Sequence, residues 1–219
     1  MEKKKAIIAI SGGIDSVVAA AKMKDENYEL YFLTVNYAQK NFKMELKNTK
    51  YFADLYNVKE HKIINMDWLG KLGCSLITDK NINIKSQNDN LIYVPYRNTC
   101  IISACVAWAE LINADLIVTG SDLGPWVGPD NSPEYYKKFN ELLKISTKIN
   151  KKLKIVAPLN YNDKKDNIKL GLSLNVPFEH TWTCITRNDK ACGECLPCKE
   201  RKAGFNMCGI NDPIKYLKK

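Results

Sequence analysis

The residues near the start of the chain that are best suited to chemistry form one short polar segment, Ser11-Gly12-Gly13-Ile14-Asp15-Ser16. The segment follows an apolar stretch typical of a buried strand and precedes a helical pattern. Adjacent glycines let the backbone turn its N–H groups toward one point, and a helix start adds partial positive charge. The serine hydroxyls add donors for phosphate oxygens, whereas the Asp15 carboxylate is better suited to holding Mg²⁺ or orienting the loop. The segment therefore predicts a phosphate-binding loop.

Two other glycine-rich phosphate loops do not fit this segment. Neither the Walker pattern Gly-x-x-x-x-Gly-Lys-Ser/Thr nor the dinucleotide pattern Gly-x-Gly-x-x-Gly occurs in it. A plain glycine turn is the structural alternative, but it leaves the serines and the aspartate unexplained. Apolar residues at the ends of the first two strands could flank adenine or ribose, or belong simply to the sheet core. The predicted nucleotide contacts are Ile10, Ser11, Gly12, Gly13, Ile14, Asp15, Ser16, Val17 and Val35.

Two cationic residues stand where they could meet phosphate or carboxylate oxygens. Arg97 opens an apolar helical pattern, and its guanidinium can bind two oxygens at once. A surface arginine is the alternative, although cations are disfavoured at the start of a helix. Lys164 follows a predicted strand and could offset charge on pyrophosphate, but lysine is abundant in this chain. Together with Asp15, these two residues are the predicted catalytic group.

A second chemical motif is the cysteine cluster Cys184-x7-Cys192-x2-Cys195-x2-Cys198. Four thiolates close a tetrahedral Zn²⁺ site and leave no open position for catalysis, so the cluster predicts a structural zinc site. An iron–sulfur cluster is the alternative, but the Cys-x3-Cys-Pro continuation of the ferredoxin pattern is missing. Eight cysteines without an export signal argue against a disulfide framework. The scattered cysteines are interpreted as packing residues; they are Cys74, Cys100, Cys105 and Cys208.

Composition and charge are those of an ordinary globular protein. The 219 residues are 45% hydrophobic and 26% charged, without repeats or low-complexity tracts. The net charge of +9 would attract polyanions such as ATP or RNA, but the lysines are dispersed, which favours a plain solvated surface. The first apolar run, residues 6–10, is too short for a signal peptide or a membrane span. We therefore expect a cytoplasmic protein with neither a membrane partner nor a stable nucleic-acid partner.

Strand and helix patterns alternate, which predicts an α/β fold with a doubly wound, five-stranded, mostly parallel sheet and helices on both faces. In such sheets ligands bind at the carboxyl ends of the strands, where the phosphate loop lies. The predicted strands cover residues 5–10, 30–37, 60–66, 115–120 and 154–159, and the predicted helices cover 16–27, 41–56, 97–113 and 133–150, with another opening after Asp163. Residues 67–93 are predicted to be an irregular flap. We expect two parts, an ATP-binding α/β domain over 1–178 and a zinc-binding subdomain over 179–219.

With both motifs in hand, the chain resembles the 7-cyano-7-deazaguanine (preQ0) synthase family of queuosine biosynthesis, one of the pyrophosphate-loop ATPases. The resemblance covers nearly the whole chain. It rests on the phosphate loop, Asn36-Tyr37, Arg97-Asn98, Thr119-Gly120, Pro158-Leu159 with Lys164, the segment 177–184 and, most specifically, the cysteine tail 192–205. It implies an adenine-nucleotide α-hydrolase-like fold with a small C-terminal zinc-binding appendage.

The resemblance implies an ATP-dependent ligase that forms carbon–nitrogen bonds. The carboxylate of 7-carboxy-7-deazaguanine would be adenylated by ATP with Mg²⁺, and ammonia would displace AMP to give an amide. A second activation would dehydrate the amide to the nitrile. No nucleophilic cysteine is required, which agrees with a cysteine cluster devoted to zinc. The oligomer to consider is a homodimer.

The chain departs from the family pattern on loops that we expect to line the substrate pocket. Tyr96 replaces a glycine, Lys40 and Asn41 replace an arginine and a histidine, and the stretch 121–131 differs from the family's Asp-x-Ser-Gly-Tyr-Pro-Asp-Cys-Arg run. Tyr96 or Trp126 could stack on the deazapurine ring, with simple packing as the alternative. These departures keep open a related adenylase acting on another acid, a tRNA or another macromolecule. A non-catalytic zinc module for nucleic acid is a further alternative, but it leaves the phosphate loop unexplained.

Overall fold

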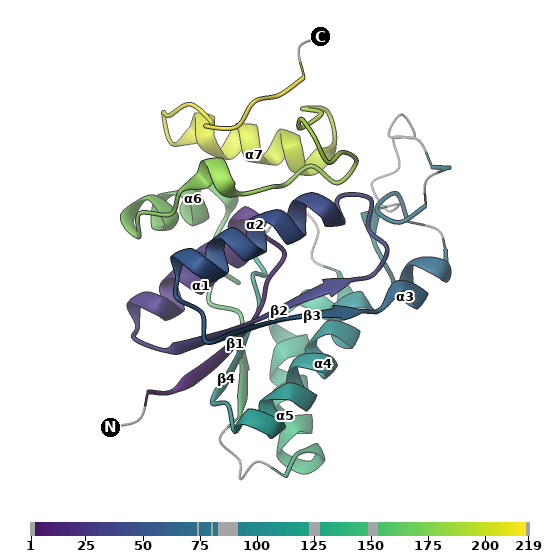
Figure 1. Ribbon diagram of the computed structural model, residues 1–219, viewed down its shortest axis with the longest axis vertical. Helices are drawn as coiled ribbons and strands as arrows, with labels where there is room; N and C mark the ends of the chain where they lie inside the picture. The colour runs from purple at the N-terminus through teal and green to yellow at the C-terminus, as the bar shows by residue number, and fades with distance from the viewer. Residues whose placement is uncertain are drawn as a thin grey trace.

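Five strands alternate with helices along the chain and form one sheet in the order β3-β2-β1-β4-β5 (Figure 1). The computed structural model describes residues 3–73, 75–79, 81–82, 92–122, 128–148 and 153–217. The strands are β1 (Lys5–Ala9), β2 (Glu29–Asn36), β3 (Glu60–Asn65), β4 (Leu116–Val118) and β5 (Lys154–Val156). The helices are α1 (Ile14–Asp25), α2 (Phe42–Leu55), α3 (Asp67–Lys71), α4 (Arg97–Ile112), α5 (Pro133–Ser146), α6 (Lys164–Ser173) and α7 (Leu196–Met207), with 3₁₀ turns η2 (Pro129–Asn131) and η3 (Phe178–His180). The predicted α/β fold class is confirmed, and every strand pairing is parallel.

Helices cover both faces of the sheet because successive side chains of a strand point to opposite faces. In β1, Ile7 belongs to the apolar cluster that includes α4 and α5, whereas Ile8 belongs to the cluster that includes α1 and α6. Figure 1 shows α1, α2 and α6 on one side of the sheet and α4 and α5 on the other. Burial on both faces explains why β1 is a continuous apolar run in the sequence.

The strand order reverses at β1, which pairs with β2 on one side and with β4 on the other. Chain segments leaving neighbouring strands therefore diverge to opposite faces and leave a crevice beyond their carboxyl ends. The phosphate loop follows β1 directly, so the topology places it at this crevice. The prediction that the turns after the strands face one site follows from the same geometry.

Local signals in the sequence located the helix starts more accurately than the ends of the strands. Ser132 caps α5 by accepting a hydrogen bond from the Tyr135 N–H, and Asp163 caps α6 by accepting one from the Asp166 N–H, as predicted. The fourth and fifth predicted strands are longer than β4 and β5, and the residues that follow β4, Thr119 and Gly120, line the crevice. The helix predicted to reach residue 150 ends at Ser146.

Two helices lie where the sequence predicted none. The short helix α3 lies within the predicted flap 67–93, where an ion pair of 2.6 Å joins the Lys71 Nζ to the Asp67 carboxylate. Much of the rest of that flap lies outside the described residues. The other helix, α7, begins directly after Cys195. Its helical pattern was not recognised in the sequence, because the closely spaced cysteines were interpreted only as metal ligands. None of the described helices is long and apolar enough to cross a membrane.

Candidate active site

A pocket of about 380 Å³ lies at the carboxyl ends of β1, β2 and β4. Its walls combine the phosphate loop, the starts of α2, α4 and α6, the segment after β4 and part of the C-terminal tail. The predicted site residues among its lining are Ile10, Ser11, Gly13, Ile14, Asp15, Ser16, Val35, Arg97 and Lys164. The structure thus brings residues from distant parts of the chain to one place.

Two predicted nucleotide contacts, Gly12 and Val17, are not among the residues that line the pocket. The Val17 side chain is fully buried in the apolar core between α1 and the sheet. Any contact from this position to a nucleotide would come from its backbone. Gly12 acts on the pocket indirectly, through the shape of the loop.

The phosphate loop turns at Gly12, whose φ of +75° lies in the left-handed region that glycine adopts without strain. A Cβ at this position would lie 3.0 Å from the Asn48 Cβ and 3.2 Å from the Glu45 carbonyl oxygen. The next residue, Gly13, precedes the first turn of α1, and no side chain of the described residues caps this turn. Its free N–H groups are therefore available to an anion at the helix start.

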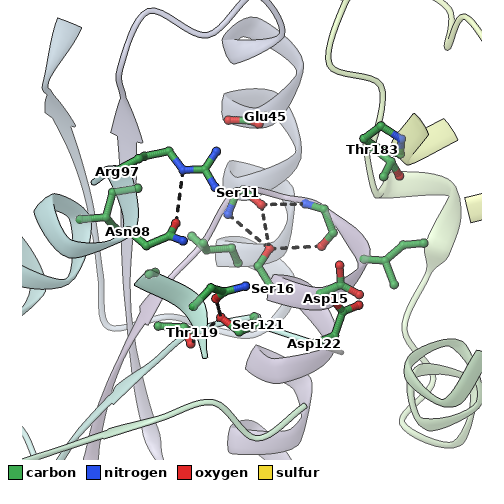
Figure 2. A pocket seen from close by; sticks show the side chains of 18 of the residues that line it. Ser11, Asp15, Ser16, Glu45, Arg97, Asn98, Thr119, Ser121, Asp122 and Thr183 are labelled. Carbon is green, nitrogen blue, oxygen red and sulfur yellow. Dashed lines mark hydrogen bonds between the residues drawn. The ribbon is translucent and has the colours of Figure 1, made fainter. Parts of the chain in front are cut away.

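The two serines of the loop hold its conformation. The Ser16 hydroxyl donates to the Gly13 carbonyl oxygen at 3.2 Å, and the Ser11 hydroxyl accepts from the Gly13 N–H at 3.3 Å. The two hydroxyl oxygens lie 3.2 Å apart. Figure 2 marks this contact with a dashed line. The loop is thus arranged before any ligand binds, and this reduces the entropy cost of gripping phosphate.

Lys164 joins two carboxylates at the floor of the pocket. Its Nζ lies 2.6 Å from the Asp15 Oδ2 and 2.8 Å from the Asp122 Oδ2. The Asn167 amide donates to the same two carboxylates at 2.9 Å and 3.1 Å. Burial by itself would lower the pKa of the Lys164 amine, but the two carboxylates outweigh it and raise that pKa above its ordinary value. The amine is therefore a fixed positive charge at neutral pH.

Asp122 is a site residue that the sequence analysis did not single out. It lies in the stretch that departs from the family pattern, and Figure 2 shows its carboxylate beside that of Asp15. The sequence could have indicated Asp122 by its position, four residues after the last residue of β4. A segment that directly follows a parallel strand lies at the edge of the sheet where ligands bind. Two adjacent carboxylates are suitable Mg²⁺ ligands, because this ion prefers oxygen and is commonly held by one or two carboxylates.

Arg97 lies at the start of α4 and lines the pocket on the side opposite Asp15 and Asp122 (Figure 2). Its Nε donates to the Asn98 side-chain oxygen at 3.2 Å, and one terminal nitrogen donates to the Tyr37 hydroxyl at 3.4 Å. The guanidinium also lies 5.5 Å from the centre of the Tyr37 ring. The remaining N–H groups are not used in these contacts, so Arg97 can bind an anion.

Asp130 explains how a cation is accommodated at the start of α4. This buried carboxylate accepts hydrogen bonds from the Asn98 N–H at 2.9 Å and the Thr99 N–H at 3.3 Å. It therefore offsets the partial positive charge of the helix start, which would otherwise oppose Arg97. The sequence did not reveal this cap, because Asp130 lies more than thirty positions along the chain from the residues whose N–H groups it caps.

Tyr96 does not wall the pocket, contrary to the expectation from its position before Arg97. Its side chain is 64% exposed and does not line the cavity. Its φ is +60°, in the left-handed region, so a glycine at this position is favoured by the backbone rather than by the size of a substrate. Trp126, the other residue expected to stack on a ring, lies outside the described residues.

The four clustered cysteines come together in the tail. Their sulfur atoms all lie within 4.8 Å of one another, which fits four thiolates around one tetrahedral Zn²⁺. Backbone N–H groups of Glu194 and Cys195 point at the Cys192 sulfur at 3.4 Å and 3.3 Å. Such N–H donors stabilise a thiolate. The cluster can therefore hold a metal ion, as predicted.

The tail also forms one wall of the pocket. Trp182, Thr183, Ile185, Pro197 and Glu200 are lining residues, and the Trp182 N–H donates to the carbonyl oxygen of Gly12 at 2.8 Å. Ile185 directly follows the metal-site residue Cys184. The metal cluster and the phosphate loop are consequently parts of one connected structure.

Arg201 connects the tail to this wall and is fully buried. Its guanidinium forms an ion pair with Asp212, with an Nε–Oδ2 distance of 2.9 Å. It also donates to the Thr181 hydroxyl at 2.7 Å, the Thr183 hydroxyl at 3.2 Å and the Phe178 carbonyl oxygen at 3.0 Å. Arg201 thereby holds the residues on both sides of Trp182.

Comparison with known proteins shows similarity along the whole chain. Residues 5–209 match the model of the family described as queuosine biosynthesis protein QueC. The chain is 36% identical to a 7-cyano-7-deazaguanine synthase of Oceanobacillus iheyensis, over 99% of this chain and 100% of that protein. It is 38% identical to a 7-cyano-7-deazaguanine synthase of Thermoplasma volcanium, over 98% and 92% of the two chains.

Solved structures show a similar fold at low sequence identity. The U34-tRNA thiolase NcsA of Methanococcus maripaludis matches with a TM-score of 0.51 and 16% identity, over 95% of this chain and 68% of that one. The NMN synthetase of Francisella tularensis matches with a TM-score of 0.50 and 16% identity, over 95% and 78%. At this identity the likeness concerns the fold alone.

Proposed function

The chain belongs to the queuosine biosynthesis protein QueC family, and we propose that it is an ATP-dependent 7-cyano-7-deazaguanine (preQ0) synthase. In this proposal it is a ligase that joins ammonia to 7-carboxy-7-deazaguanine and then dehydrates the amide to the nitrile. The observation that carries the proposal is one pocket lined by a phosphate loop at a helix start, a free guanidinium and a lysine held between two carboxylates. Full-length similarity to relatives named as this synthase supports the choice of substrate.

The first step is transfer of AMP to the substrate carboxylate. A carboxylate oxygen attacks the α-phosphorus of ATP, the bond to the β-phosphate breaks, and pyrophosphate leaves with its electron pair. The loop Ser11–Ser16 grips the leaving pyrophosphate through backbone N–H groups and hydroxyls. Lys164 supplies a fixed positive charge beside it. Mg²⁺, held by Asp15 and Asp122, would neutralise phosphate charge when bound.

Arg97 suits the other reacting group. Its remaining N–H groups face the pocket from the side opposite Asp15 and Asp122, where they can bind the substrate carboxylate or the α-phosphate. A fork of two donors would hold two oxygens in line with the bond that breaks. The start of α4 is itself fixed by Asp130, so the guanidinium is positioned before substrate arrives.

The second step replaces AMP by ammonia at the activated carbon and gives the amide with loss of one proton. A second ATP then activates the amide oxygen, and loss of AMP and a proton gives the nitrile. No cysteine or histidine is among the described residues that line the pocket, so no covalent enzyme intermediate is invoked. The polar pocket walls bind and orient the reactants and exclude water from the activated carboxylate.

The metal cluster has a structural role in this proposal. Zn²⁺ bound by Cys184, Cys192, Cys195 and Cys198 would have no open coordination position, and its contribution would be to fold the tail. We further propose cytoplasmic action on small molecules, without a stable nucleic-acid or membrane partner. The division into an ATP-binding domain, 1–178, and a zinc-binding part, 179–219, remains a proposal, as does a homodimer.

Mass spectrometry of the products tests the proposal. Purified protein incubated with ATP, Mg²⁺, ammonium and 7-carboxy-7-deazaguanine should release AMP and pyrophosphate and should form the nitrile. Omission of the acid should abolish AMP release. Formation of ADP and phosphate, or failure of the wild-type protein to convert this acid while it still binds ATP, would contradict the proposal.

A further inference from the structure

A second polar group lines the pocket, on the segment after β2 and the first turn of α2, and the adenylation chemistry does not use it. It consists of Glu45, whose side chain is about nine-tenths buried, and Asn41, which is 3% exposed. Figure 2 shows Glu45 on its helix beside the space that Arg97 and Ser11 border. A buried carboxylate facing a cavity is costly unless hydrogen bonds or a ligand compensate for the lost water.

Two side chains fix the orientation of the Glu45 carboxylate. Gln39 donates to its Oε2 at 2.7 Å, and Asn41 donates to its Oε1 at 3.0 Å. Gln39 is itself fixed, because its amide also donates to the Val35 carbonyl oxygen and accepts from the Tyr37 N–H. The carboxylate is therefore held rigidly, as a recognition group must be.

The group presents hydrogen-bond acceptors with unused capacity. An ionised carboxylate accepts about four hydrogen bonds, and the described side chains supply only two of them to Glu45. Because this carboxylate only accepts, Asn41 must turn its nitrogen toward it, which leaves the amide oxygen facing elsewhere. That buried oxygen has no partner among the described residues. A ligand that fits here must bring hydrogen-bond donors, either N–H or O–H groups.

The charges around Glu45 leave it in need of such donors. Within the described residues Glu45 belongs to no ion pair, although Arg97 is close enough to affect its charge. Burial raises the pKa of the Glu45 carboxyl, and the hydrogen bond from Gln39, the charge of Arg97 and the hydrogen bond from Asn41 reverse only part of that rise. Further N–H donors from a ligand would stabilise the ionised form.

We infer that Glu45 and Asn41 recognise the donor edge of a guanine-type ring, its ring N–H and adjacent exocyclic amine. The inference rests on the proposed function, because 7-carboxy-7-deazaguanine carries this edge. The ring N–H and one amine N–H lie side by side and match the two oxygens of a carboxylate. Asn41 supports this recognition by holding the Glu45 carboxylate through its amide nitrogen.

Two other donors in the reaction fit less well. The corresponding edge of adenine places a ring nitrogen acceptor beside its amine, and this nitrogen would face a carboxylate oxygen without a proton between them. An ammonium ion would place a second positive charge near Arg97, which already affects the Glu45 carboxyl. The edge with two adjacent donors is therefore the best match.

Steady-state kinetics with a matched pair of acids tests this inference. The wild-type protein should prefer 7-carboxy-7-deazaguanine over the analogue without the exocyclic amine by roughly 100-fold or more in kcat/KM, because a site built for an N–H rejects a ligand that lacks it. Glu45→Gln should reduce that preference to less than about tenfold and raise the KM for the acid, with the KM for ATP unchanged. Asp54→Asn removes an exposed carboxylate from the same helix and should retain the full preference.

The wild-type comparison decides the inference even where Glu45→Gln does not fold. Equal use of both acids by the wild-type protein would overturn it, as would a Glu45→Gln variant that raises the KM for ATP or ammonium instead of the acid. Absence of any AMP release with either acid, by a protein that binds ATP, would refute the proposed function itself. The two failures are therefore distinguishable.

Discussion

At the scale of single residues, the candidate site depends on charges that are held by their neighbours. Lys164 is positioned by Asp15 and Asp122, and Arg97 is positioned by Asn98 and Tyr37. Each cation is thus part of a hydrogen-bonded group instead of a mobile surface charge. Variants at these residues should affect turnover more than folding, because both cations line the pocket.

Removal of the Lys164 amine is the first prediction. Lys164→Met should lower kcat roughly 100-fold, because a preorganised charge beside the leaving pyrophosphate is lost and no cation separates the two carboxylates. Lys165→Met, at the next position on the same helix, is the control, and its kcat should be close to that of the wild type. Equal loss of kcat in both variants would contradict the prediction, because the effect would then come from any positive charge in this region and not from the Lys164 amine.

The pH dependence of stability provides a second residue-scale prediction. The pKa of Lys164 is raised in the folded protein, so its charge stabilises the fold fully below the unfolded pKa of about 10.4. This contribution should be lost only as the pH rises through the still higher folded pKa. Urea unfolding of the wild type and of Lys164→Met should therefore differ by a constant amount between neutral pH and about pH 10. A difference that shrinks between neutral pH and that limit would contradict the assignment.

Tyr96 provides a third residue-scale prediction, and it concerns stability instead of specificity. Tyr96→Gly should increase the free energy of unfolding by about 0.5–1 kcal/mol, because glycine adopts a φ of +60° without strain. Tyr96→Ala removes the same ring but keeps the Cβ, so it should give no comparable gain. Urea unfolding measures both, and an unchanged KM for the acid in Tyr96→Gly would agree with a side chain outside the pocket.

At the scale of elements, the tail is held against the phosphate loop by one buried guanidinium. Arg201 binds Asp212 on one side and the segment 178–183 on the other, and that segment bonds to Gly12. The helix α7 is therefore linked to the phosphate loop by two sets of hydrogen bonds, from Arg201 to the segment 178–183 and from that segment to Gly12. Displacement of α7 should disturb nucleotide binding even though most of its residues are remote from phosphate.

Arg201→Met tests this coupling. It should destabilise the protein by about 3–5 kcal/mol, because Asp212 is left buried without its partner. It should also raise the KM for ATP in whatever fraction remains folded. Arg187→Met is the matched control, because it breaks an exposed pair with Asp189 and should cost less than about 1 kcal/mol. A destabilised variant with an unchanged KM for ATP would show that the tail wall does not affect the loop.

At the scale of the whole molecule, the cysteine cluster and the pocket are built from the same segments of the tail. Ile185 and Pro197 line the pocket, and each lies directly beside a cysteine of the cluster. A folded tail is therefore a condition for a complete pocket. A metal ion held by these cysteines, as we propose, would therefore affect nucleotide binding through the fold of the tail.

Metal removal provides the corresponding prediction. The purified protein should be colourless and contain one Zn²⁺ per chain by elemental analysis. Chelation, or Cys195→Ser, should lower the melting temperature and weaken ATP binding together, because the tail wall unfolds. Cys100→Ser changes a cysteine outside the cluster and should leave metal content unchanged. Visible absorption from an iron–sulfur cluster would contradict the assignment of zinc.

The sequence by itself determined the α/β class, the order of the five strands, the glycine-rich loop after β1 and the four clustered cysteines, whereas the helices α3 and α7 were not predicted. These features depend on local physics, such as apolar periodicity, adjacent glycines before a helix and short ligand spacings, and all of these can be read within a few residues. The family resemblance followed from the same segments. Comparison with relatives confirmed the family and the fold class.

The tertiary structure alone decided which residues meet. Asp122 and Asp15 both contact Lys164, and Asp130 caps α4. Glu45 lines the same pocket as these residues. The contributing segments are far apart in the sequence, so no local pattern could reveal that they meet. The structure also showed that the tail is a wall of the pocket. The physical reason is that parallel strands bring their carboxyl ends together from remote parts of the chain. Loop length and packing then decide which side chains enter the space between them.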